Sequence, residues 1–159
     1  MSEHEEFFTF REYMRKEQEV LSPSAEDYME MIYRLSREYG FTRVNDLAVA
    51  LNVQPPSVTK MIQKLAEMNL IKYEKYGVIM LEQRGIETGR ALLIRHNTIE
   101  MFLRLLNITN GILEETEIIE HTINPQILCG MKDLIDFFQD NPDILQIFNE
   151  YRISRLEHT

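Results

Sequence analysis

Residues 43–81 read RVNDLAVALNVQPPSVTKMIQKLAEMNLIKYEKYGVIML, and this stretch decides the fold. Asn45 is a residue type that caps helices, and the apolar residues after it predict a short helix over 46–51. A tight connector, Asn52-Val53-Gln54, follows this helix. Pro55-Pro56 then predicts the first turn of another helix, where a missing backbone N–H does no harm. The pattern is that of a helix-turn-helix.

The second helix of this motif has an apolar stripe at helical spacing, formed by Val58, Ile62 and Leu65. It is expected to end near Asn69. Residues 71–81 are rich in Tyr, Val and Ile around a turn at Tyr76-Gly77, which predicts two strands joined as a hairpin. A helix-turn-helix followed by such a hairpin is a winged helix, with a two-stranded wing.

Helical patterns precede and follow this segment. An aromatic cluster predicts a short amphipathic helix within residues 1–20, and Ser22 and Ser24 are candidate caps for a helix that ends near Tyr39, before Gly40. Further helices are expected at 85–106, 114–122, 126–138 and after Asn141-Pro142. The fold class is mainly α. Three parts are predicted: an N-terminal extension (1–20), a winged-helix domain (21–90) and an all-helical domain (91–159).

Composition restricts the class of protein. The 159 residues are 44% hydrophobic and carry a net charge of −9. No apolar run approaches the length of about 18 residues that spans a bilayer. The acidic start is unlike a secretory signal, and Cys129 is the only cysteine. We therefore expect a cytoplasmic protein that does not associate with membranes.

The charges are unevenly distributed along the chain. Residues 43–95 contain eight basic and five acidic side chains, so the remainder is strongly acidic. A basic block favours contact with a polyanion, and the carboxylates elsewhere favour contact with cations.

The basic block contains the predicted second helix, the element that enters the major groove of DNA in a helix-turn-helix. Polar side chains there can bond to base edges, and lysines can contact phosphates or guanine. The candidate DNA-binding residues are Arg43, Gln54, Pro55, Ser57, Thr59, Lys60, Gln63, Lys64 and Lys75. The alternative is a small helical subdomain that binds no nucleic acid.

Carboxylates and histidines also recur at ligand spacing. Asp27 and Glu30 share one helix face, and a second helix presents a Glu-x-x-Glu-His run at i, i+3 and i+4. With a histidine on the long helix, the candidate metal ligands are Asp27, Glu30, His96, Glu117, Glu120 and His121. This oxygen-rich set suits Mn²⁺ or Fe²⁺, and six side chains are enough for two ions. Alternatively, Asp27 is part of a helix cap and the glutamates form a solvated face.

The chain resembles the diphtheria toxin repressor family, most closely its shorter manganese transport regulator branch. The resemblance covers about residues 21–140. It is carried by the segments SPSAEDYME (22–30), RVNDLA (43–48), PSVTKM (56–61), QKL (63–65), YEKY (73–76), RH (95–96) and IEH (119–121).

The resemblance implies a homodimer whose operator binding is promoted by metal, acting as a repressor of metal-uptake genes. It implies the same six ligands, with Glu30 and Glu120 as bridges between two Mn²⁺ ions per subunit; Fe²⁺ or another divalent transition metal is the alternative. Iron-type relatives carry Met and Cys in place of Asp27 and Glu117, so this chain favours manganese. One departure is in the wing, where the arginine that the family places before the glycine is missing between Tyr76 and Gly77.

Two other functions remain open from the residues. Binuclear carboxylate–histidine sites also occur in enzymes, but no catalytic nucleophile or base stands out, and we predict that the chain is not an enzyme. A winged-helix protein that binds DNA or a protein partner without sensing metal is the second alternative.

Overall fold

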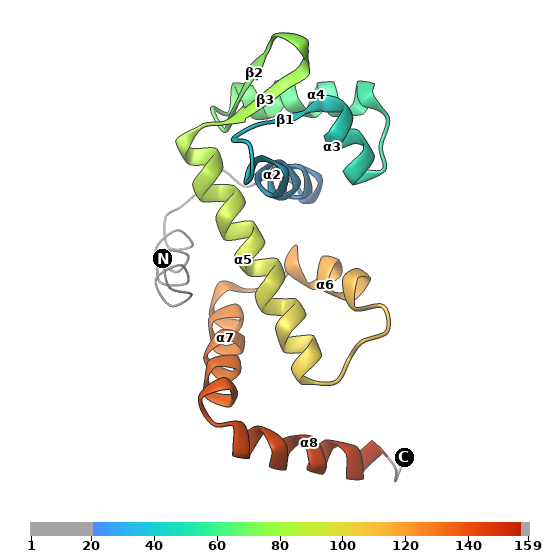
Figure 1. Cartoon of the computed structure of the whole chain (residues 1–159), viewed down its shortest axis with the longest axis vertical. Helices are drawn as coiled ribbons and strands as arrows, with labels where there is room; N and C mark the ends of the chain where they lie inside the picture. Colours follow the sequence, from blue (N-terminus) through green and yellow to red (C-terminus); the bar gives the residue numbers. More distant parts are fainter. Residues whose placement is uncertain (1–20, 157–159) are drawn as a thin grey trace. The chain divides into compact units, whose positions relative to one another are not determined.

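The computed structural model describes residues 21–156, which form two compact units. The first comprises the described residues up to Arg95 and the second those from His96 onward. Helix α5, Gln83–Leu105, belongs to both (Figure 1). The helix expected within residues 1–20 lies outside the described residues. No helix of residues 21–156 combines the length and apolarity that a membrane crossing requires.

The first unit contains three helices and a small sheet before α5 (Figure 1). In chain order its elements are α2 Pro23–Ser36, β1 Thr42–Arg43, α3 Val44–Leu51, α4 Pro55–Glu67, β2 Ile71–Glu74, the 3-10 turn Lys75–Gly77 and β3 Val78–Leu81. The winged helix-turn-helix predicted from the sequence is therefore confirmed.

Helix α2 begins as expected but ends early. The Ser22 hydroxyl accepts a hydrogen bond from Ala25 N at 3.3 Å and caps the helix. The helix ends at Ser36, where Gly40, at φ 78°, donates its N–H to Ser36 O. Tyr39, expected near the end of this helix, lies beyond its last turn and is 70% exposed.

The helix-turn-helix differs from the prediction in one detail. Helix α3 begins at Val44, so the residue before it is Arg43 and Asn45 lies within the first turn. Asn52 ends α3 with a left-handed backbone at φ 53°, a conformation that asparagine tolerates. Pro55 and Pro56 open α4, and its predicted apolar stripe of Val58, Ile62 and Leu65 is fully buried.

The sheet has three strands, in the order β1-β3-β2, instead of the two predicted. Strand β1 is antiparallel to β3, with Arg43 opposite Val78. Strand β2 is also antiparallel to β3, with Ile71 opposite Leu81. The sequence could not predict β1, because two residues are too few to produce an alternating pattern.

One hydrophobic core holds the first unit together. It gathers side chains from α2, α3, α4, the sheet and α5, including Met29, Ile32, Leu47, Ile62 and Ile79, all fully buried. Helix α5 approaches α2 closely at Gly89, where an added Cβ would lie 2.4 Å from Tyr33 Cβ. A glycine is therefore required there for α2 and α5 to pack together.

The second unit is entirely helical in its described residues. After the end of α5 it contains α6 Ile112–Glu120, α7 Pro125–Asp140 and α8 Pro142–Leu156. Asn124 caps α7 by accepting a hydrogen bond from Gln126 N at 2.8 Å. Arg152 of α8 donates a hydrogen bond to Leu106 O, just beyond α5, at 2.7 Å.

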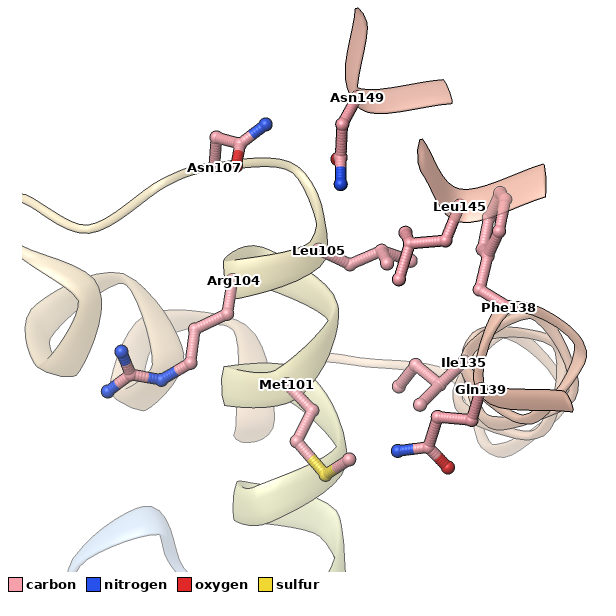
Figure 2. A pocket seen from close by; sticks show the side chains of 9 residues that line it. All are labelled: Met101, Arg104, Leu105, Asn107, Ile135, Phe138, Gln139, Leu145 and Asn149. Carbon is pink, nitrogen blue, oxygen red and sulfur yellow. The ribbon is translucent and has the colours of Figure 1, made fainter. Parts of the chain in front are cut away.

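Helices α5, α7 and α8 of this unit leave a pocket of about 350 Å³ between them (Figure 2). Its apolar lining includes Leu105 of α5, Ile135 and Phe138 of α7 and Leu145 of α8.

Candidate metal centre and nucleic-acid interface

The outer face of α4 carries the predicted base-reading side chains. Residues Gln54, Pro55, Ser57, Lys60, Gln63 and Lys64 are all exposed. Thr59 is half-buried, and its hydroxyl donates to Pro55 O at 3.2 Å, which stabilises the first turn of α4. The helix thus buries its apolar stripe in the core and presents amide, hydroxyl and ammonium groups to solvent. These are the groups that bond to base edges and phosphates.

The two other predicted DNA-binding residues lie at the sheet. Arg43 ends β1, and its Nη1 donates a hydrogen bond to Tyr76 O at 3.2 Å. Its guanidinium also lies 5.8 Å from the centre of the Phe41 ring. Lys75 is exposed in the turn between β2 and β3. Both cations are therefore beside the hairpin turn.

Helix α2 carries the two ligand candidates of the first unit, Asp27 and Glu30. Glu30 is buried, at 7% exposure, and its Oε1 accepts a hydrogen bond from Arg34 Nη2 at 2.5 Å. Arg34 lies one turn later on the same helix and partly neutralises the carboxylate. Burial raises the pKa of the neighbouring Tyr28 phenol above its ordinary value. Tyr28 is therefore neutral and adds no charge beside these carboxylates.

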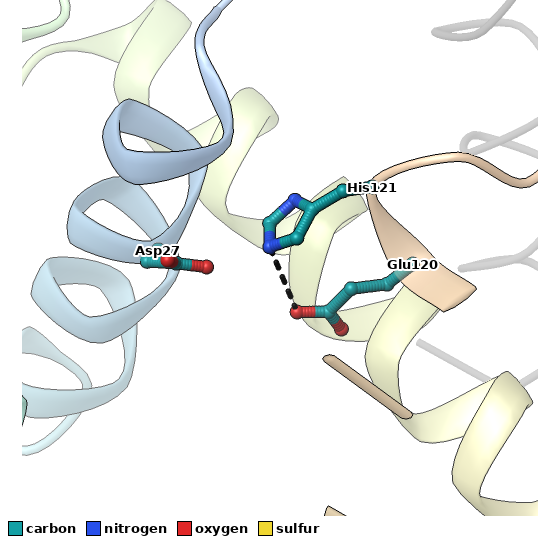
Figure 3. Close-up of side chains that lie close together, drawn as sticks. All are labelled: Asp27, Glu120 and His121. Atoms are coloured by element: carbon teal, nitrogen blue, oxygen red, sulfur yellow. Dashed lines mark ion pairs between the residues drawn. The ribbon is translucent and has the colours of Figure 1, made fainter. Parts of the chain in front are cut away.

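In the second unit, three of the four ligand candidates come together around Glu120. This carboxylate is only 2% exposed, and its Oε2 lies 2.9 Å from His96 Nδ1. His121 Nε2 lies 3.9 Å from Glu120 Oε1, a pair that Figure 3 marks with a dashed line. A carboxylate between two imidazoles is a compact set of oxygen and nitrogen donors.

Local structure explains this convergence. Glu120 is the last residue of α6 and His121 is its C-cap, so adjacent residues supply both groups. Residue 96 is on α5, and its 6% exposed side chain meets Glu120 from that helix. Glu117 lies one turn before Glu120 on α6, and its side chain is exposed.

Sequence reasoning missed two interactions close to these residues. His96 Nε2 lies 3.7 Å from Glu100 Oε2, and Arg104 bonds the same carboxylate at 2.6 Å. The i, i+4 spacing of His96 and Glu100 was a usable signal for this pair. In the first unit, Arg95 binds both carboxylate oxygens of Glu26, at 2.8 and 3.2 Å. No local pattern could reveal that pair, because 69 residues separate its members.

The residues fit a divalent transition metal by their chemistry. A buried carboxylate is costly unless a cation or a set of hydrogen bonds compensates its charge. Glu120 is almost fully buried, and imidazole and carboxylate are donors that Mn²⁺, Fe²⁺ and Zn²⁺ accept. The donor set contains no thiolate, because the only cysteine, Cys129, lies in α7.

Two protein-family models match most of the chain. Residues 20–79 match the iron dependent repressor N-terminal DNA-binding domain, and residues 82–149 match the metal-binding and dimerisation domain of the same family. The chain belongs to the iron dependent repressor family. It is therefore a member of a family of DNA-binding transcription regulators, not of an enzyme family.

Curated relatives within this family resemble the chain over most of their length. The HTH-type transcriptional regulator MntR of Geobacillus kaustophilus is 40% identical over 130 residues, covering 81% of this chain and 92% of that protein. MntR of Bacillus subtilis is 40% identical over 123 residues, covering 77% of this chain and 87% of its own.

Solved structures share the fold. The manganese regulator SloR has a TM-score of 0.64 and 27% identity over 74% of this chain and 55% of its own. ScaR with bound Zn²⁺ has a TM-score of 0.60 and 30% identity over 71% of this chain and 54% of its own. The chain thus spans about half the length of these two proteins.

Proposed function

We propose that this protein is a manganese-dependent transcription regulator that binds operator DNA as a homodimer and represses metal-uptake genes in the cytoplasm. The N-terminal unit binds DNA through α4, and the C-terminal unit senses the metal and dimerises. Relatives named MntR, together with the family's metal-binding and dimerisation domain, support this function.

The observation that carries the metal-sensing part is the buried Glu120 carboxylate between His96 and His121. A buried anion whose near neighbours are two metal-ligating side chains is typical of a metal site and is unusual in a purely structural core. The carboxylate and both imidazoles belong to the second unit, the part that matches the metal-binding domain of the family.

The proposed ligands are Asp27, Glu30, His96, Glu117, Glu120 and His121, which would hold two ions in each subunit, with Glu30 and Glu120 as the carboxylates shared between them. When bound, Mn²⁺ would supply positive charge that compensates the four carboxylates. Arg34 provides part of this compensation for Glu30 in the metal-free protein. Asp27 and Glu30 belong to the DNA-binding unit, so a metal held by them would link metal binding to the unit that contacts the operator.

Operator binding with and without metal tests this proposal. A duplex is first selected from a random-sequence pool with the protein in Mn²⁺, and its Kd is then measured by fluorescence anisotropy. We expect Mn²⁺ to strengthen binding at least about tenfold relative to chelator, which corresponds to a coupling free energy of about 1.4 kcal/mol. Mg²⁺ at the same concentration is the control. Equal binding in chelator and Mn²⁺ would show that the protein binds DNA without sensing metal.

A further inference from the structure

Helix α2 carries a fixed cation beside the buried carboxylate of Glu30, one of the proposed metal ligands. Arg34 Nη2 donates a hydrogen bond to Glu30 Oε1 at 2.5 Å, from one turn later on the same helix. A guanidinium has no lone pair to offer a metal ion, and it stays protonated at physiological pH. Arg34 therefore lies at this carboxylate as a charge and not as a further ligand. The other buried acid of residues 21–156, Glu120, has imidazoles as near neighbours instead.

A second ion pair of the first unit has a different geometry. Arg95 binds both carboxylate oxygens of Glu26, and its side chain is 10% exposed. Arg34 bonds one oxygen of Glu30 through one nitrogen, and its side chain is 36% exposed. Two parallel hydrogen bonds fix a guanidinium more firmly than one. The Arg34 guanidinium can therefore turn toward solvent more easily than that of Arg95.

The Arg34 side chain gives up part of its hydration to reach Glu30. Its Nε is buried and forms no hydrogen bond within the described part of the chain. A buried N–H without an acceptor is unfavourable, so an additional attraction must hold the side chain in place. The negative charge of the buried Glu30 carboxylate supplies that attraction. If a divalent cation neutralised Glu30, this attraction would end and the guanidinium would be better solvated outside the site.

We propose that Arg34 determines the affinity of the metal centre by competing with the metal ion for Glu30. In the metal-free protein it stabilises the buried carboxylate. An incoming divalent ion either displaces this cation or is repelled by it at short range. In both cases the empty state is stabilised relative to the loaded state, which weakens the apparent metal affinity. The proposal rests on the metal-sensing function proposed above, and it assigns to one side chain a part in setting the metal concentration at which the sensor responds.

Metal binding in the absence of DNA tests this competition. The Kd for Mn²⁺ is measured by isothermal titration calorimetry on the full chain of the wild type, Arg34→Leu, Arg34→Lys and Arg37→Leu. Leucine is a strong helix former without charge, whereas lysine keeps the charge. Arg37 is the matched control, because it is exposed at the end of α2. It lies two turns from Glu30, about 10 Å along the helix axis, where salt screens its charge.

We expect Arg34→Leu to bind Mn²⁺ about fivefold more tightly than the wild type, the upper end of the effect of a partly exposed ion pair. Arg34→Lys and Arg37→Leu should stay within about twofold of the wild type, because the first keeps the charge and the second removes a screened one. A purely structural ion pair predicts unchanged or weaker binding in Arg34→Leu, since loosening α2 cannot strengthen a metal site. Either of those results, or an equal gain in Arg34→Lys or Arg37→Leu, would overturn the competition and leave the proposed function standing. A wild type that binds no Mn²⁺ would mean that the proposed function itself fails.

Discussion

Both units bury apolar side chains and a carboxylate, Glu30 in the first and Glu120 in the second, and the contrast between them lies in the surfaces of their helices. The first encloses its apolar residues in a single core and presents the polar face of α4 to solvent. The second buries His96 and Glu120, whereas Ile118, Ile127 and Ile147 remain 57–66% exposed. Because the second unit matches the family's metal-binding and dimerisation domain, we propose that a second subunit covers these side chains and that a cation completes the site at Glu120.

The largest effect is expected from the core of the first unit. Ile62→Ala removes a fully buried side chain that packs α4 onto the core, so it should lower the free energy of unfolding by roughly 2–5 kcal/mol. Val49→Ala on α3 is the matched control, since Val49 is 82% exposed, and should change it by less than about 0.5 kcal/mol. Urea denaturation measures both. If both variants lowered the free energy of unfolding equally, burial of Ile62 in this core would not be what stabilises the first unit.

The exposed apolar surface of the second unit should control dimerisation. On α8, Ile144, Ile147 and Tyr151 share one helix face and are all exposed. Ile147→Glu should weaken dimerisation by about 2 kcal/mol or more, roughly 30-fold, if this face is central to the interface. Sedimentation equilibrium should give a dimer for the wild type and dissociation for the variant. Gln146→Glu, at an exposed neighbour, is the control. A monomeric wild type at micromolar concentration would contradict the proposal that the second unit dimerises through this surface.

The polar face of α4 gives a smaller, salt-dependent effect. Lys60→Ala or Lys64→Ala should weaken operator binding by roughly 1–3 kcal/mol if the lysine reads a base. If it contacts a phosphate instead, the loss should be uniform across sequences and the salt slope should fall by about 1. Kd values at several salt concentrations distinguish the two. Unchanged binding in both variants would mean that α4 is not the reading helix.

The smallest effect concerns the choice of metal. Asp27→Met replaces a hard carboxylate on α2 with a soft thioether, so the response should shift from Mn²⁺ toward Fe²⁺. We expect the ratio of the activating concentrations of the two ions to change by about tenfold, on the order of one lost ligand interaction. Anaerobic anisotropy titrations with each ion measure the ratio. If the ratio of activating Mn²⁺ and Fe²⁺ concentrations did not change, Asp27 would not be a ligand that selects the metal.

The sequence predicted the first unit well because its signals are local. The prolines that open α4, the stripe at Val58, Ile62 and Leu65 and the turn at Tyr76-Gly77 each depend on neighbouring residues. Strand β1 was missed because it owes its existence to pairing with β3, more than thirty residues later. The same limit hid the Arg95–Glu26 pair.

The candidate metal ligands were also predicted from local spacing, and only in part. The Glu-x-x-Glu-His run indicated a helix that brings Glu120 and His121 to neighbouring positions, and these residues lie at the end of α6. That His96 meets Glu120 at 2.9 Å is a tertiary contact that spacing alone could not supply. The burial of Glu120, which makes a compensating cation favourable, also depends on packing and was not predictable from the Glu-x-x-Glu-His run.

The most direct test of metal-controlled DNA binding is a Mn²⁺ titration of wild type, Glu120→Ala and the exposed α6 control Glu115→Ala. Bound Mn²⁺ is counted by equilibrium dialysis, and anisotropy follows binding to the selected duplex. We predict two ions per subunit and full activation for the wild type and Glu115→Ala. Glu120→Ala should lose activation while its circular dichroism stays native, because removing a bridging carboxylate weakens both ion sites and relieves repulsion in the metal-free protein. One ion per subunit in the wild type, or full activation of Glu120→Ala, would contradict the binuclear switch.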